Sequence, residues 1–184
     1  MFDLVVGNAV LHHFVDFSET LEHVLRLLKP GGRAIFAEPF AYGYLLAMTI
    51  LKIATHELMR TRAILPDMSM YDFIVDNIAY RARYYDDPSK LEGLTDKHLF
   101  REQHIISLGN QLGFSVRFEN YADDTYYDEF MRDILRTYDI ANRNVADRAD
   151  ELYQVIRDYL KEALPNYFPH FRFIVMEKTV KTKS

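Results

Sequence analysis

The sequence predicts a mixed α/β fold, and three features at the start of the chain support this prediction. Residues 2–6 form an apolar run rich in β-branched side chains, which is typical of a strand. Residues 21–28 repeat leucine and valine at the three-and-four spacing of one helical face. Residues 33–38 form a second apolar run, as in strands buried on both faces. Two strands joined by a helix of this length are expected to be parallel, in a right-handed βαβ unit.

The boundaries of these elements carry local signals. Gly7 and Asn8 are expected to end the first strand. Asp16 or Ser18 can cap the helix, because a short polar side chain can accept hydrogen bonds from its first free amides. The Pro-Gly-Gly turn at residues 30–32 is expected to end the helix, since proline cannot continue it and glycine adopts left-handed dihedrals.

Two segments together resemble a known family. FDLVVGNAVLHHF (residues 2–14) and LLKPGGRAIFAEP (residues 27–39) resemble the fourth and fifth strands of class I S-adenosylmethionine-dependent methyltransferases. Later in the chain, residues 96–112 resemble the last helix of that family and residues 115–120 its sixth strand. Residues 170–180 resemble its antiparallel seventh strand. The resemblance implies a partial Rossmann-like methyltransferase sheet with two helical insertions.

The family's glycine-rich cofactor turn has no counterpart in this sequence. None of the seven glycines forms a GxG pattern, and the adjacent pair Gly31 and Gly32 belongs to a turn. In the family this turn follows a first strand, as does the acidic residue that binds the ribose hydroxyls. We therefore expect a truncated protein, the C-terminal half of a methyltransferase, that is inactive without the upstream cofactor-binding half.

Composition narrows the class of protein. The length of 184 residues suits a single domain spanning residues 1–184, and the formal net charge of −5 argues against nucleic acid as the main partner. The absence of cysteine excludes disulfides and is compatible with a reducing cytoplasm. The most apolar stretch, residues 41–54, is shorter than a bilayer span and contains Lys52. We expect a cytoplasmic protein without a membrane span.

Two insertions, at about residues 41–94 and 121–168, are too long to be structureless loops and are expected to be helical. Residues 44–60 are apolar on nearly every side, so this helix either packs beneath other inserted helices or roofs a hydrophobic substrate pocket. Thr95 is the expected N-cap of the helix that follows the first insertion. Further helices are expected at residues 68–83, 128–141 and 146–164.

The resemblance places the cofactor site directly after the strand expected at residues 2–6 of this chain. Open α/β sheets bind ligands outside the carboxyl ends of their strands, where the strand order reverses. In the resembled family this position corresponds to Asn8, Ala9 and Val10, which are expected to contact S-adenosylmethionine. The alternative is that Asn8 only ends a strand.

His13 and Glu38 are the candidate catalytic residues. An imidazole can accept a proton near neutral pH, and a carboxylate at a strand end can orient a substrate hydroxyl or amine. For His13 the alternative is capping or packing, and for Glu38 it is a solvent-facing strand end. No metal site is expected, because adjacent residues such as His12 and His13 should point in different directions and His98 and His104 do not share a helical face.

Two functions remain open. The first is a methyltransferase portion that acts on a small, hydrophobic molecule by direct methyl displacement, with no dedicated catalytic motif. The second is a non-catalytic binding or dimerisation module. In that case the bare edge of residues 4–7 would pair with another chain, as in a homodimer.

Overall fold

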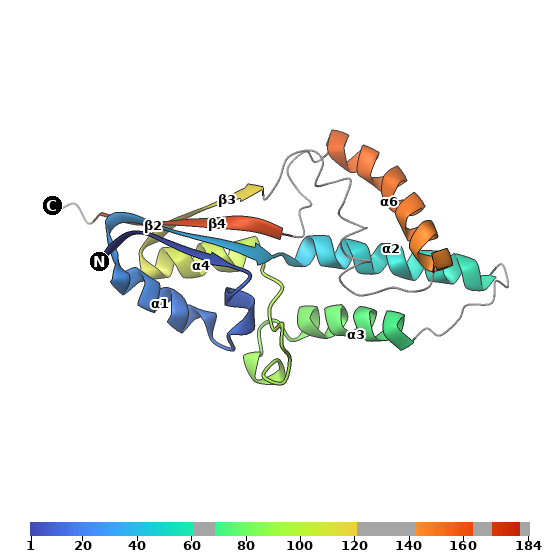
Figure 1. The fold of residues 1–184 in the computed structure, drawn as a ribbon, viewed down its shortest axis with the longest axis horizontal. Helices are drawn as coiled ribbons and strands as arrows, with labels where there is room; N and C mark the ends of the chain where they lie inside the picture. The colour runs from blue at the N-terminus through green and yellow to red at the C-terminus, as the bar shows by residue number, and fades with distance from the viewer. Residues whose placement is uncertain (61–68, 121–142, 164–170, 181–184) are drawn as a thin grey trace. The chain divides into compact units, whose positions relative to one another are not determined.

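The computed structural model describes residues 1–60, 69–120, 143–163 and 171–180 (Figure 1). The chain forms two compact units. The first unit contains the sheet and comprises Met1–Ala41, Arg81–Tyr121 and Phe171–Ser184. The second unit contains helices from both insertions and comprises Tyr42–Tyr80 and Ala122–His170.

The first unit contains a four-stranded sheet in the order β1-β2-β4-β3. β1 and β2 are parallel, and β4 lies antiparallel to both β2 and β3. The α/β class and the antiparallel last strand predicted from the sequence are therefore confirmed. The strands span Phe2–Asn8 (β1), Leu28–Pro39 (β2), Phe114–Asn120 (β3) and Phe171–Lys178 (β4).

Helix α1 (Phe17–Leu27) connects β1 to β2 and begins where the sequence indicated. Asp16 is its N-cap, and one carboxylate oxygen accepts from the amides of Ser18 and Glu19. These hydrogen bonds lower the pKa of Asp16, the contact with the Ser18 side chain most of all.

The Pro-Gly-Gly segment differs from its prediction, because it lies inside β2 rather than between the helix and the strand. In the pairing of β1 with β2, Phe2 lies opposite Leu28 and Leu4 lies opposite Arg33. Two steps along β1 therefore correspond to five along β2, and the extra residues of β2 form an irregularity in that strand. Gly31 has a φ of 75°, which glycine adopts without steric cost.

Helix α4 (Glu102–Leu112) begins later than predicted, and its N-cap is Arg101 instead of Thr95. The residues before the helix form backbone hydrogen bonds with other parts of the chain, and they therefore do not adopt helical structure. Lys97 N donates to His12 O at 2.8 Å and Phe100 N donates to Pro39 O at 2.8 Å. Two short 3-10 helices, η1 (Leu11–His13) and η2 (Pro88–Lys90), complete this unit.

Helices α1 and α4 lie against the same face of the sheet (Figure 1). Their apolar sides share a core with β1 to β4, including Leu21, Phe36 and Ile105. Gly109 lets α4 lie close to β3, since a Cβ there would be 2.2 Å from Val116 Cγ2. On β1, by contrast, Leu4 and its alternate neighbours point away from this core and are exposed.

The second unit contains α2 (Ala41–Arg60), α6 (Arg143–Ala163) and most of α3 (Ser69–Arg83). α2 packs against α6 through a small apolar core, which favours the prediction that the apolar helix is covered by other inserted helices. The predicted helix at 128–141 lies outside the described residues. Among the helices described, none is long and apolar enough to cross a membrane. The small apolar core between α2 and α6 consists of Ala47, Ile50, Leu51, Ala54, Val145, Ala149 and Tyr153.

Candidate functional site

The predicted cofactor residues lie where the chain leaves β1. Asn8 is the last residue of the strand and its side chain is exposed. Ala9 has a φ of 51°, in the left-handed region, and its amide donates to Ala37 O at 2.8 Å. This strained turn directs the chain into Val10 and η1 while its backbone stays hydrogen-bonded to β2. The three residues therefore form one continuous turn at the carboxyl edge of the sheet.

Glu38 holds this turn in place from the end of β2. Its Oε1 atom accepts from Val10 N at 2.9 Å and from Leu11 N at 2.7 Å. Its Oε2 atom lies 2.7 Å from Nδ1 of His12. Glu38 is completely buried, so the alternative of a solvent-facing strand end is wrong. A buried carboxylate with this many donors fixes the loop after β1 relative to β2.

His12, and not the predicted catalytic residue His13, is the histidine whose side chain points inward. Its side chain is 8% exposed and lies between Glu38 and Asp96. Burial opposes a charge on the ring, but the neighbouring carboxylates of Asp96 and Glu38 outweigh burial, so the pKa of His12 is raised. The His12–Glu38 contact joins positions 26 residues apart, which no local sequence pattern reveals.

His13 and Asp96 complete a polar cluster at the surface. Nδ1 of His13 lies 3.0 Å from Thr95 O and 3.3 Å from Oδ1 of Asp96. The rings of His12 and His13 are 4.1 Å apart, so the expectation that these side chains diverge is wrong. The interaction with His12 lowers the pKa of Asp96. No sequence pattern indicated Asp96, because it follows a turn and belongs to no motif.

A second buried histidine, His98, fastens the loop between η1 and α1. Its Nε2 atom lies 3.0 Å from Phe14 O and 3.2 Å from Val15 O, and its own carbonyl accepts from Arg81. Burial lowers the pKa of His98, the opposite direction from His12. His98 therefore acts as a neutral connector between two loops.

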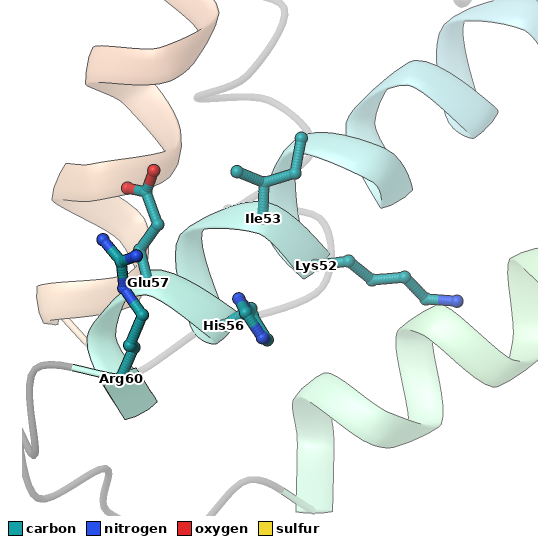
Figure 2. Close-up of a pocket in the computed structure, with 5 residues that line it drawn as sticks. All are labelled: Lys52, Ile53, His56, Glu57 and Arg60. Carbon is teal, nitrogen blue, oxygen red and sulfur yellow. The ribbon is translucent and has the colours of Figure 1, made fainter.

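The second unit has a pocket of its own along α2 (Figure 2). It measures about 360 Å³, and three of its five lining residues have charged side chains, although most of the surface that they present to the pocket is apolar. Glu57 on this wall is paired with Arg148 of α6 at 2.7 Å. The pocket is lined by Lys52, Ile53, His56, Glu57 and Arg60.

The sheet order, the βαβ unit and the polar turn at its carboxyl edge define an α/β fold of the methyltransferase type. A family model described as a methyltransferase domain matches residues 1–119, so the chain belongs to this family. The resemblance to class I S-adenosylmethionine-dependent methyltransferases is thereby confirmed. Family membership implies S-adenosylmethionine as the methyl donor.

Solved structures with some likeness to the chain include three proteins. Phosphoethanolamine N-methyltransferase 2 of Haemonchus contortus is 14% identical, with a TM-score of 0.44 over 97% of this chain and 34% of that chain. PKMT2 of Rickettsia typhi is 13% identical, with a TM-score of 0.39 over 99% and 36%. A candidate methyltransferase of Bacillus halodurans is 13% identical, with a TM-score of 0.37 over 97% and 70%. The chain thus spans about a third of the Haemonchus enzyme (34%). A search of curated proteins gives no match.

Proposed function

We propose that this chain is the C-terminal portion of a methyltransferase that transfers a methyl group from S-adenosylmethionine to a small molecule by direct displacement. The observation that carries the proposal is the preformed turn at the carboxyl end of β1, which Glu38 holds against β2. Ligands of open α/β sheets bind at this edge. A site held by buried polar contacts loses little conformational entropy when a ligand binds.

Asn8, Ala9 and Val10 fit one wall of a cofactor site. The exposed amide of Asn8 offers both a donor and an acceptor, and Ala9 and Val10 beside it are half-buried at the sheet edge. When bound, S-adenosylmethionine would supply an electrophilic methyl group. The role of these residues would be to hold its polar parts, with the opposite wall supplied by residues outside those described.

We assign different roles to the two candidate catalytic residues. The side chain of His13 is 43% exposed, so it can reach a substrate and accept a proton if the nucleophile carries one. Glu38 uses both carboxylate oxygens to hold the loop and His12, so we propose that it acts by positioning these groups.

The exposed face of β1 supports an arrangement in which another segment completes the fold. Phe2, Leu4 and Val6 are 55%, 51% and 67% exposed, although parallel sheets are normally covered on both faces. A further strand beside β1 and helices over this face would bury these side chains. On this proposal, methyl transfer belongs to the longer assembly and not to these residues alone.

Calorimetry with S-adenosylhomocysteine tests the proposal on this chain and on a version extended upstream by the natural coding sequence. We expect binding by the extended version and weak or no binding by this chain. Asn8→Ala should weaken binding by the extended version, whereas Asn110→Ala, an exposed residue of α4, should leave it unchanged. Absence of binding by both chains would refute the proposal.

A second function, dimerisation through β1, is favoured by the same exposed strand. In the described part of the sheet, β1 pairs only with β2, and its other edge can accept another strand. This proposal predicts a homodimer in multi-angle light scattering that Val6→Lys dissociates, because a charge on an edge strand opposes pairing. A monomer at all concentrations would exclude it.

A further inference from the structure

Three potential metal ligands meet beside the turn after β1. Nε2 of His12 lies 3.6 Å from Oδ1 of Asp96, and Nδ1 of His13 lies 3.3 Å from the same oxygen. The ligand atoms of the three residues all lie within 4.8 Å of one another. Ligands bound to one ion at about 2.1 Å are expected to be about 3.0–3.5 Å apart. The cluster therefore needs only small adjustments to surround an ion.

Glu38 prepares His12 for this role. When Nδ1 of His12 donates to the buried carboxylate of Glu38, Nε2 carries the lone pair, and this atom is the one directed toward Asp96. Histidines that bind metals almost always donate their other ring nitrogen to a carboxylate or a carbonyl, which fixes the tautomer and the ring orientation. The contact to Asp96, at 3.6 Å, is too long for a hydrogen bond, and an ion would bridge it.

The cluster is also accessible. The side chains of His13 and Asp96 are 43% and 52% exposed, whereas His12 forms the buried base of the cluster. Three protein ligands leave open positions for water or a further ligand, as in catalytic rather than structural metal sites. Two imidazoles and one carboxylate suit zinc and the neighbouring divalent transition metals better than magnesium or calcium.

From this geometry we propose that His12, His13 and Asp96 bind a divalent transition-metal ion, with Glu38 orienting His12. Binding requires His13 to give up its contact with Thr95 O, since Nδ1 cannot donate to the carbonyl and coordinate an ion together. Metal binding and acceptance of a substrate proton are alternative uses of His13, because a neutral imidazole that coordinates through Nδ1 carries its proton on Nε2. Metal binding itself requires neither the cofactor nor methyl transfer. It can therefore be tested separately from the proposed function.

Cobalt(II) titration of the chelator-treated chain provides the test, because nitrogen ligation gives visible absorption bands. We expect saturation at one ion per chain and displacement by zinc(II). Asp96→Asn and His13→Gln, both at exposed positions, should weaken binding by at least about tenfold. Glu38→Gln should weaken binding by about 10–100-fold through the orientation of His12.

His23→Gln is the matched control. His23 is an exposed histidine on α1 whose Nδ1 contacts Glu19 O, so its loss should leave cobalt binding unchanged. Circular dichroism of the Asp96 and His13 variants verifies that they fold. Absence of stoichiometric binding, or equal binding by wild type and these two folded variants, would overturn the proposal, as would loss of binding in the control.

Discussion

The carboxyl end of β1 and the outer face of the same strand are built in opposite ways. At the carboxyl end, polar groups are buried and paired, with Glu38 accepting hydrogen bonds from Val10 and Leu11. On the outer face, Leu4 and Val6 leave apolar surface open to solvent. The described residues thus hold one loop in place with their own hydrogen bonds, but they leave the outer face of β1 without a covering layer.

This difference indicates which features of the fold these residues can stabilise by themselves and which need a further segment. A turn needs only hydrogen bonds from residues that surround it, and β2 supplies these. A sheet face needs a second layer of apolar side chains, which must come from another segment or another molecule. Substitutions in the two regions are therefore expected to change the free energy of unfolding by different amounts.

The largest effect is expected for Glu38→Gln. The amide keeps the size of the side chain but cannot accept from all its present donors, and one of its atoms would be a donor facing a donor. We expect the free energy of unfolding to fall by roughly 2–4 kcal/mol. Urea denaturation measures this fall, with the exposed Glu22→Gln as control. Equal stability of the two variants would show that the loop is not held by this carboxylate.

Gly109→Ala tests the covered face of the sheet. The added methyl group would meet Val116 at the interface of α4 and β3, so helix or strand must move. We expect a loss of about 1–3 kcal/mol despite the higher helix propensity of alanine. A gain in the midpoint of thermal unfolding would show that α4 does not lie so close to the sheet.

Val5→Ala and Val6→Ala compare the two faces of β1 at adjacent positions. Val5 packs against the core shared with α1 and α4, whereas Val6 is exposed. We expect losses of roughly 1–2 kcal/mol for Val5→Ala and under about 0.5 kcal/mol for Val6→Ala. If the upstream extension covers the outer face, chemical denaturation of the extended chain should make the two losses similar.

The smallest expected effect is the pH dependence of the free energy of unfolding that arises from the two buried histidines, His12 and His98. The pKa of His12 is raised from 6.5, so its contribution to stability is present below this value and is lost as pH rises through the shifted pKa. The pKa of His98 is lowered from 6.5, so acidification below 6.5 removes its contribution, because the unfolded chain binds the proton first. NMR titration of the ring protons without metal should give two values on opposite sides of 6.5. Values on the same side would contradict the assigned surroundings.

Local patterns were sufficient for most of the first unit. The β-branched run predicted β1, the three-and-four spacing predicted α1, and Asp16 caps that helix as expected. The predicted start of α4 was wrong, because the amides of Lys97 and Phe100 donate to carbonyls far away in the sequence, in η1 and at the end of β2. These hydrogen bonds compete with helix formation after Thr95. Local propensity cannot register such competition.

The sequence by itself determined the class of this protein, since the strand runs, the helix spacing and the two segments that resemble the family are properties of neighbouring residues. Tertiary structure alone decided which groups meet at the carboxyl edge: Glu38 beneath Val10, His12 rather than His13 inward, and Asp96 beside both rings. These contacts join residues far apart in the chain. Their partners are set by how strands and loops are packed, and by the need of each buried polar atom to find a partner there.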